Sequence, residues 1–375
     1  MKIALNLVFL TPGEIGGMET YARELIPRLA ARDDLDLTCL VNRDCAEAGG
    51  GPWGDLCAME IVPVRARNRL EWVRGEQQHV PRIADRLGAD LIHSLASTAP
   101  LWSRAVRVTT VHDLNFKLAP DAHFGLRGLG MGLLVPAAVR RSRRVIVDAA
   151  STRDDLGTHL HTSPSKVDVV PLAANRNIAV TPTPAAELRR RLGLGERTVV
   201  LSVSAKRPHK NLARLLEAIA AIPQAQRPLL VLPGYATPHE QELRERARAL
   251  GIDSDVVFLG WIAAADLEGL YALAEVVVFC SLYEGFGLPV LEAMARGIPV
   301  VTSDRSSLPE VAGDAALLVD PEDPAAIRAG IERVLGDRAL AQRLSEAGRL
   351  RAATFSWERT AELTAASYAR AISRP

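Results

Sequence analysis

The chain has 375 residues, which at roughly 100–200 residues per domain favours two domains. It is 48% hydrophobic and 24% charged, a composition that excludes a disordered chain. The formal net charge of +1 excludes a nucleic-acid-binding polycation. Only five of the 45 basic residues are lysine, yet two of them, Lys206 and Lys210, lie four residues apart.

The four cysteines predict a reducing compartment, because none forms a C-x-x-C pair and no histidines stand at zinc-finger spacing. No run reaches the roughly 18 apolar residues that a membrane span needs. The first apolar run, Ile3–Leu10, has no small-residue cleavage site after it and reads as a strand rather than a signal peptide. We therefore expect a cytoplasmic protein.

Short β-rich runs alternate with helical patterns through the first half of the chain. Met18–Arg32 is one such helix, with Tyr21, Leu25 and Leu29 on one face. The predicted strands are Ile3–Leu10, Leu35–Val41, Glu60–Val64, Asp90–His93, Val106–His112, Arg144–Val147 and Lys166–Val170.

The alternation of strands and helices begins again after Ala179–Ala185, a segment interrupted by prolines that we interpret as a linker. The strands predicted there are Thr198–Val203, Pro228–Leu232, Asp255–Leu259, Glu275–Cys280, Ile298–Thr302 and Ala315–Val319. The alternation predicts an α/β protein with two Rossmann-like, doubly wound domains facing a cleft. We expect an acceptor-binding domain at residues 1–178 and a donor-binding domain at 179–356, with a last helix, about 357–375, packed back on the first. Ligands bind such sheets at the carboxyl ends of strands.

The segment Ser281–Pro299 carries the strongest signal of chemistry, because it follows an apolar strand and opens a helix predicted over Phe286–Arg296. Gly285 and Gly287 allow a tight turn, and a helix N-terminus attracts phosphate. Glu284 and Glu292 are separated by about 10 Å along such a helix. The alternative is a plain turn with a solvated glutamate. We favour a site that binds a diphosphate between two carboxylates.

Lys206, Arg207, His209 and Lys210 form a basic cluster after another predicted strand. Because lysine is a compact charge that pairs well with phosphate, the cluster indicates a phosphate site rather than a solvated loop.

Two further features lie at the ends of first-half strands. Gly16 and Gly17 lie before the first helix, at a spacing that does not match the dinucleotide fingerprint, so they indicate either a ligand-binding loop or a plain loop. His112 ends a strand and is interpreted either as a site residue or as a core histidine whose hydrogen bonds are made within the protein.

The D-x-D of Asp253 and Asp255 precedes its strand, away from the expected ligand edge, and we expect no metal site there.

Together these motifs resemble the retaining, nucleotide-sugar-dependent glycosyltransferases of GT-B fold, in particular family 4, over nearly the whole chain. The E-x7-E motif at Glu284–Glu292 and the following Gly297–Pro321 are its most specific part. The resemblance implies that Glu284 contacts the donor sugar and Glu292 the ribose. It implies that the main-chain amides of Phe286, Gly287 and Leu288 hold the diphosphate and sugar, with Gly285 also among the substrate-binding residues. It also implies that Lys210, assisted by Lys206, neutralises the diphosphate, that His112 of VHDLNF contacts the sugar, and that Gly16 and Gly17 approach the diphosphate and acceptor.

The implied reaction is transfer of a hexosyl group, mannosyl-, glucosyl- or rhamnosyl-like, from a nucleoside diphosphate sugar to an acceptor hydroxyl. The expected mechanism is a front-face route with retention, without a metal or other cofactor. Two stretches depart from the family pattern, Val170–Ala173 and Asp148–Ala150. The alternatives are a nucleotide-sugar epimerase or isomerase on the same fold and a nucleotide-sugar-binding protein without turnover. A dehydrogenase is disfavoured because neither half carries the glycine fingerprint.

The acceptor is expected to be a sugar, a lipid-linked molecule or a small molecule, and not a nucleic acid. The apolar segment Leu126–Arg144 ends in Arg140, Arg141, Arg143 and Arg144. It reads either as a helix that rests on the anionic inner face of the cell membrane or as a core helix whose arginines favour its carboxyl end. We favour the second interpretation.

Overall fold

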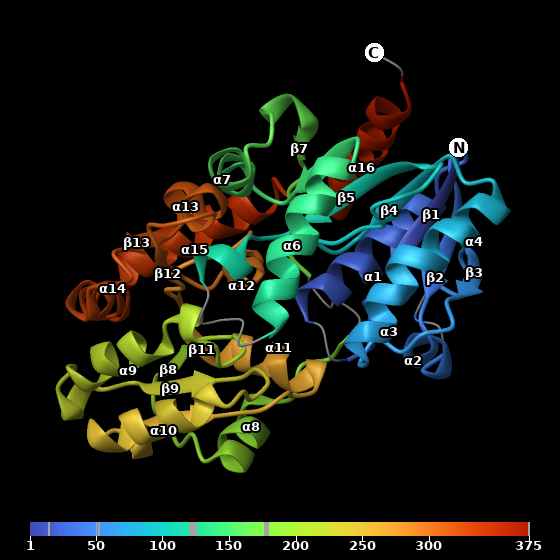
Figure 1. The fold of residues 1–375 in the computed structure, drawn as a ribbon. Coiled ribbons are helices and arrows are strands. Elements are labelled where there is room, and N and C mark those ends of the chain that lie inside the picture. Colours follow the sequence, from blue (N-terminus) through green and yellow to red (C-terminus); the bar gives the residue numbers. More distant parts are fainter. Residues whose placement is uncertain (14–15, 50, 52, 120–125, 176–179, 374–375) are drawn as a thin grey trace. The chain divides into compact units, whose positions relative to one another are not determined.

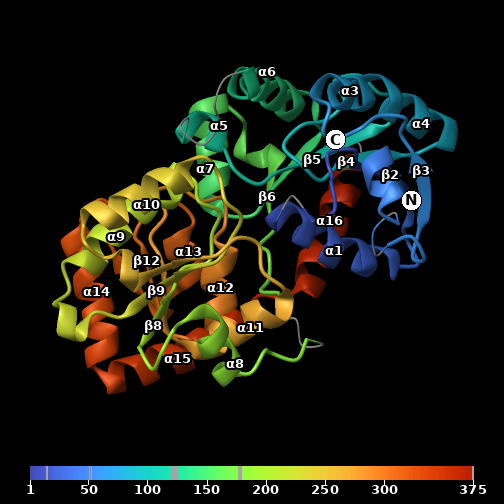
Figure 2. The same ribbon diagram turned by 90° about the horizontal axis from the view of Figure 1, so that it is seen from below.

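The computed structural model forms two compact units, one of Met1–Leu172 with Ser356–Pro375 and one of Ala173–Phe355. The described residues are 1–13, 16–49, 51, 53–119, 126–175 and 180–373, and for 126–129 only the helical backbone is described. The boundary predicted between residues 178 and 179 lies outside the described residues. Figures 1 and 2 show each unit as a sheet with helices packed on both sides.

The first unit is built on a seven-stranded parallel sheet with the strand order β3-β2-β1-β4-β5-β6-β7. Valine- and isoleucine-rich runs form these strands because both faces of a parallel sheet are buried. The bounds are β1 (Lys2–Leu7), β2 (Asp36–Val41), β3 (Ala58–Ile61), β4 (Leu91–Ser94), β5 (Val106–Val111), β6 (Arg144–Val147) and β7 (Val167–Val169).

Helices cover both faces of this sheet. On one face, α16 lies beside α1 and packs on β5 and β6, so the last helix belongs to the first unit (Figure 2). On the other, α4, α6 and α7 pack against the apolar side chains of the strands. The bounds are α1 (Gly17–Ala30), α2 (Arg43–Glu47), α3 (Arg69–Arg74), η1 (Gly75–His79), α4 (Val80–Leu87), α5 (Asn115–Leu118), α6 (Leu126–Arg141), α7 (Ala150–Leu160), η3 (Pro164–Lys166) and α16 (Trp357–Ile372).

The second unit has a six-stranded parallel sheet with the order β10-β9-β8-β11-β12-β13. The chain order reverses between β8 and β11, and ligands bind doubly wound sheets at such a point. The bounds are β8 (Val199–Leu201), β9 (Leu229–Leu232), β10 (Val256–Phe258), β11 (Ala274–Phe279), β12 (Val300–Ser303) and β13 (Leu317–Val319).

In the second unit α9, α10 and α14 bury leucines and isoleucines against the strands, while α12 packs on β11 and β12 and is itself covered by α15 (Figure 1). The bounds are α8 (Ala185–Leu192), η4 (Pro208–Lys210), α9 (Leu212–Ala220), η5 (Gln224–Gln226), α10 (His239–Ala249), η6 (Asp253–Asp255), α11 (Ala264–Leu273), α12 (Leu288–Ala295), α13 (Leu308–Ala312), η7 (Gly313–Ala315), α14 (Pro324–Gly336) and α15 (Arg338–Ala352).

The predicted α/β architecture is confirmed, and every predicted strand has an observed counterpart. One helix start was predicted wrongly. Helix α12 begins at Leu288 rather than at Phe286, because Gly287 has a left-handed backbone (φ 106°) that a helix cannot include.

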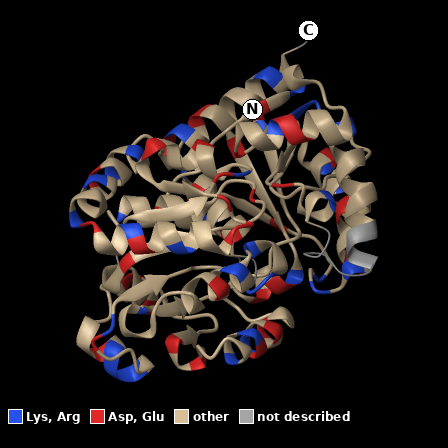
Figure 3. Cartoon of the chain, turned by 90° about the vertical axis from the view of Figure 1, so that its left-hand side faces the viewer, with Lys and Arg blue, Asp and Glu red and all other residues tan. Residues whose placement is uncertain are grey.

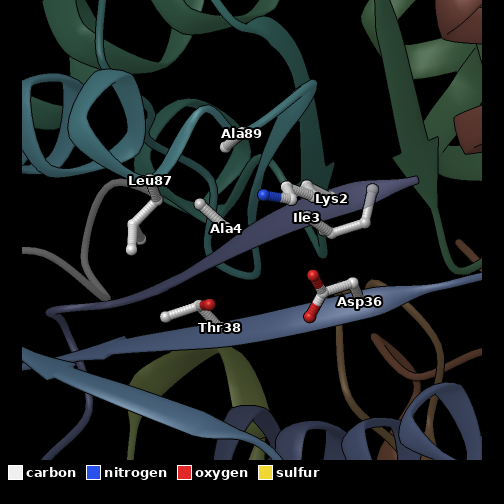
Figure 4. A pocket seen from close by; sticks show the side chains of 7 residues that line it. All are labelled: Lys2, Ile3, Ala4, Asp36, Thr38, Leu87 and Ala89. Carbon is white, nitrogen blue, oxygen red and sulfur yellow. The ribbon is translucent and has the colours of Figure 1, made fainter.

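Acidic and basic residues are interspersed along the helices, as the red and blue segments of the cartoon show (Figure 3). A small cavity of about 110 Å³ lies at the amino ends of β1 and β2, lined by Lys2, Asp36 and Thr38 among others (Figure 4). It opens at the edge of the sheet opposite to the carboxyl ends of these strands, so it is not the candidate site.

None of the helices in the described ranges is both long and apolar enough to cross a bilayer.

Candidate functional site

A lysine and a glutamate from two loops of the second unit form the centre of the candidate site. The Nζ of Lys210 lies 2.6 Å from Oε1 of Glu284, and both side chains are largely buried. Lys210 ends η4 after β8, whereas Glu284 follows β11, the neighbouring strand. The ammonium also faces the Phe279 ring at 5.3 Å. The structure thus brings together a cation and a carboxylate that the sequence separates by 74 residues.

The glycine loop follows Glu284 directly. Gly285, Phe286 and Gly287 are buried, and Phe286 packs edge-on against Phe355 at 5.9 Å. A Cβ on Gly287 would lie 2.5 Å from Leu308 Cδ2, so only glycine fits both the backbone and the space. Leu288 then begins α12, with the positive end of the helix dipole at this loop. A helix N-terminus of this kind suits an anion.

Two serines that were not predicted as site residues hold this loop in place. Ser306 donates to the Glu284 carbonyl at 2.6 Å and accepts from the Glu284 N–H at 3.2 Å. Ser307, fully buried, lies within hydrogen-bond distance of the carbonyls of Glu284 (3.0 Å) and Phe286 (2.8 Å). Ser306 has a left-handed backbone (φ 57°), uncommon for a serine. The sequence feature that could have identified these serines is their position just after β12, at the carboxyl edge of the sheet.

Asn211 holds the loop that carries Lys210. Its Nδ2 donates to the carbonyls of Cys280 (2.9 Å) and Pro321 (2.7 Å), and its backbone is left-handed (φ 60°). Asn is one of the few residues that adopt this conformation readily. This side chain therefore fixes the position of Lys210 relative to the end of β11.

The side chain of Lys206 does not lie beside Lys210 at the predicted phosphate site. Its side chain is fully buried, and its ammonium donates to the carbonyls of Leu232 (2.8 Å), Leu259 (2.5 Å) and Gly234. Burial lowers the pKa of Lys206 to about 8, so the ammonium persists at neutral pH. All three N–H groups are used by the main chain, so assistance to Lys210 at a diphosphate does not fit this geometry. Lys206 instead ties together the loops after β8, β9 and β10.

Glu292 lies in α12 and forms a separate cluster from the Lys210 pair. Tyr271 donates to its Oε2 at 3.0 Å, and Arg296, one turn further on, is paired with Glu268. Burial raises the pKa of Glu292 to about 7, against the opposing effects of Arg296 and Tyr271. A carboxylate poised near neutrality can accept hydrogen bonds from vicinal hydroxyls.

In the first unit, His112 follows β5 at the carboxyl edge of the sheet. Its Nδ1 lies 2.7 Å from Asp148 Oδ2, and its Nε2 lies 3.0 Å from the Leu95 carbonyl oxygen. The ends of β4, β5 and β6 therefore meet at one imidazole ring. Both ring nitrogens contact protein oxygens, so the sugar contact that the resemblance implies for His112 does not fit a hydrogen bond from either nitrogen in this arrangement.

The paired glycines of the first unit lie at the start of α1. Gly16 precedes the helix with a positive φ of 60°, and Gly17 is its first residue and exposed. Glu19 closes the loop by accepting from the Gly13 N–H at 2.7 Å while pairing with Arg23.

The D-x-D segment lies at the amino end of β10, as expected. Asp255 is paired with Arg197 and Arg227, both at 2.9 Å. These pairs give Asp255 a structural role.

Two family models match the chain, "Glycosyltransferase Family 4" over residues 15–177 and "Glycosyl transferases group 1" over residues 185–351. The O-antigen chain mannosyltransferase B of Escherichia coli is 31% identical over 264 residues, which are 70% of this chain and 69% of that protein. A D-inositol 3-phosphate glycosyltransferase of Salinispora arenicola is 32% identical over 96% of this chain and 88% of its own length.

Among solved structures, HepE of Anabaena in complex with UDP and glucose superposes with a TM-score of 0.78. It is 20% identical and covers 98% of this chain and 99% of its own, a likeness that shows the GT-B fold. With the family models matching both units, the chain belongs to glycosyltransferase family 4 and is a glycosyltransferase of GT-B fold.

Proposed function

We propose that this glycosyltransferase moves a hexosyl group from a nucleoside diphosphate sugar to an acceptor hydroxyl, with retention at the anomeric carbon. The observation that carries the proposal is the Lys210–Glu284 pair beside the glycine loop and the N-terminus of α12. It combines a cation and a helix N-terminus for phosphate with a carboxylate for sugar hydroxyls. The complex of HepE with UDP and glucose supports this class of donor.

Each donor-site residue has a role in this proposal. Lys210 and the main-chain N–H groups of Gly285–Leu288 bind the diphosphate. Glu284 accepts hydrogen bonds from sugar hydroxyls, and Glu292 accepts them from the ribose. Because Lys210 is already paired with Glu284, donor binding exchanges part of that ion pair for contacts with phosphate and sugar.

The proposed transfer proceeds on one face of the sugar. The bond between the anomeric carbon and the diphosphate oxygen breaks, and a bond from that carbon to the acceptor oxygen forms on the same face. The acceptor proton moves to the departing phosphate oxygen, so no protein base is required. The protein contributes positioning and stabilisation of the charge that develops on the diphosphate. Lys210 and the end of α12 supply that stabilisation, so the proposed reaction needs no metal ion.

The most direct test is a transfer assay with UDP-, GDP-, ADP- and dTDP-sugars, with products identified by mass spectrometry. A mannosyl donor is the first candidate because the Escherichia coli relative is named a mannosyltransferase; glucosyl and rhamnosyl donors follow. We expect one donor to yield a glycosylated acceptor and free nucleoside diphosphate. An isomerised nucleotide sugar formed without any acceptor would instead identify an epimerase. Binding without any conversion would overturn the proposal.

The core-helix interpretation favoured from the sequence fits one side of α6, where Val135 and Val139 are buried. For the exposed side we further propose that this is a cytoplasmic enzyme whose first unit contacts the inner face of the membrane. The contact patch is defined as Trp102, Leu133, Arg140 and Arg141. Trp102 is 69% exposed and Leu133 is 76% exposed. The Arg141 guanidinium lies 4.5 Å from the centre of the Trp102 ring. Arg140 follows Leu133 by seven residues on α6, close to two helical turns, so these two residues share a face. Residues 126–147 contain no acidic side chain, so the patch suits an anionic lipid surface.

Vesicle sedimentation tests this contact. We expect binding to phosphatidylglycerol vesicles that weakens with salt, and loss of binding in Trp102→Ala/Leu133→Glu. Leu350→Glu is the matched control, because Leu350 is 73% exposed on the arginine-rich helix α15 of the second unit. Equal binding of both variants, or no binding of the parent protein, would exclude the patch as a lipid contact.

A further inference from the structure

The His112 ring is held on both sides by oxygen atoms. The Leu95 carbonyl oxygen accepts from Nε2 at 3.0 Å, and Asp148 Oδ2 lies 2.7 Å from Nδ1. A carbonyl oxygen can only accept, so Nε2 must carry a proton. A carboxylate also only accepts, so Nδ1 carries a second proton when Asp148 is ionised. With an ionised Asp148, the ring is therefore an imidazolium.

The surroundings of Asp148 favour this charged pair over an isolated carboxylate. Asp148 is 2% exposed, and within the described residues its Oδ1 has no hydrogen-bond partner. Burial raises the pKa of Asp148, whereas the charge of His112 and the hydrogen bond to it lower that pKa. A carboxylate in this position therefore stays ionised only with a cation in contact. The group in contact that can supply this positive charge is His112, whose Nδ1 lies 2.7 Å from Asp148 Oδ2.

The titratable groups around the ring come from four elements. Asp148 follows β6, Asp113 is the next residue in the chain, His93 lies in β4, and Tyr21 of α1 packs edge-on at 5.0 Å. Burial opposes the charge on His112, but the charge of Asp148 and the hydrogen bonds to Asp148 and Leu95 outweigh it and raise the pKa of His112. Burial lowers the pKa of His93 to about 3, so that neighbour is neutral and adds no second cation.

We propose that Asp148 is a positioning residue that holds His112 as a doubly protonated imidazolium with both nitrogens engaged. In this state the ring is a fixed cation at the carboxyl edge of the first sheet, and it has no free lone pair with which to accept a proton. The geometry places one proton on Nε2 and another between Nδ1 and Asp148 Oδ2, and the proposal assigns that second proton to His112. The effect of this charge on transfer rests on the proposed function. One consequence is that His112 cannot be the base that takes the acceptor proton. This agrees with transfer of that proton to the departing phosphate.

The charge on His112 can be measured without a substrate, by histidine-selective ¹⁵N–¹H NMR of the full chain. His112→Gln assigns the resonances by their loss. We expect both His112 nitrogens to remain protonated at pH 7.5, where an ordinary histidine with a pKa near 6.5 is mostly neutral. In Asp148→Asn the side-chain amide can donate to Nδ1, so the ring should become neutral while it stays in place. Asp113→Asn is the matched control, and its His112 should remain charged.

A neutral His112 at pH 7.5 in the parent protein would overturn the proposal, as would an unchanged imidazolium in Asp148→Asn. These results do not depend on turnover, so they stand even if the proposed reaction fails.

The kinetic test uses whichever donor the transfer assay identifies. We expect Asp148→Asn to lower kcat at least tenfold with little change in the KM for the donor, and Asp148→Glu to recover part of the loss. Because the cation is lost as pH rises, kcat should fall on the alkaline side, and Asp148→Asn should abolish this dependence. A rate that instead falls at acidic pH in the parent, and does so with the pKa of His112, would identify the ring as a base and contradict the proposal.

Discussion

The ammonium of Lys210 and the carboxylate of Glu284 meet at 2.6 Å across the loops that follow β8 and β11. These strands are neighbours in the second sheet, at the point where its chain order reverses. The pair therefore brings a cation and a carboxylate to one point at the carboxyl edge of the sheet. In the proposed donor complex the lysine stabilises charge on the diphosphate, and the glutamate accepts from the sugar.

Replacing Lys210 should affect turnover far more than folding. We expect Lys210→Ala to lower transfer by about 100-fold or more, because one preorganised charge at a reacting centre is worth several kcal/mol. Its circular dichroism spectrum should be unchanged. Lys117→Ala, an exposed lysine of the first unit, is the matched control. Near-normal transfer by Lys210→Ala would contradict the proposal that Lys210 binds the diphosphate.

Lys206, four residues earlier, should behave in the opposite way. Lys206→Met leaves the carbonyls of Leu232, Gly234 and Leu259 without this donor inside the protein. An unsatisfied buried group costs about 1–3 kcal/mol, so we expect the free energy of unfolding to fall by about 3 kcal/mol or more in urea denaturation. Wild-type stability combined with lost donor affinity would restore the phosphate role expected from the sequence.

The Ser307 hydroxyl should matter for donor binding because it holds the backbone of the glycine loop. We expect Ser307→Ala to raise the KM for the donor several-fold, since the carbonyls of Glu284 and Phe286 lose a donor. Ser303→Ala is the control, because Ser303 caps the neighbouring Arg305 N–H instead. If both variants change KM equally, Ser307 has no specific role in this loop.

Donor affinity should depend on pH through Glu292. Its pKa is raised to about 7, so the carboxylate gains a proton as pH falls through neutrality. If the ionised form binds the ribose, affinity should increase by about tenfold from pH 6 to pH 8. Calorimetric titrations at the two pH values measure this. The dependence should disappear in Glu292→Gln, and a persistent dependence in that variant would point to another group.

The architecture and the loops at the carboxyl ends of the strands were predictable because they follow from strong local signals. Apolar runs bounded by turn residues identified the strands, and the E-x7-E motif placed Glu284 after β11. The pairing of Lys210 with Glu284 was not predictable from spacing, because it depends on β8 lying next to β11. The role of Lys206 was missed for a related reason, since a lysine after a strand reads as exposed unless the neighbouring loops are seen to enclose it.

The positioning residues were hidden because their signals are weak in sequence. In the sequence, Ser306 and Ser307 do not differ from other loop serines. Their role depends on the fold, which places the carbonyls of Glu284 and Phe286 beside their hydroxyls. Asp148 was noted only as a departure from the family pattern. Its meaning depends on β6 pairing with β5, which brings the carboxylate to His112. Such contacts between strand ends are set by tertiary structure, which local patterns do not encode.

The central claim, that the Lys210–Glu284 site binds a nucleoside diphosphate, is tested most directly by calorimetric titration of UDP, GDP, ADP and dTDP into the wild-type protein and Lys210→Gln. We predict that at least one nucleotide binds the wild-type protein and that its affinity falls at least tenfold in the variant. Equal affinity for both proteins, or no binding of any of the four to the wild type, would contradict this account.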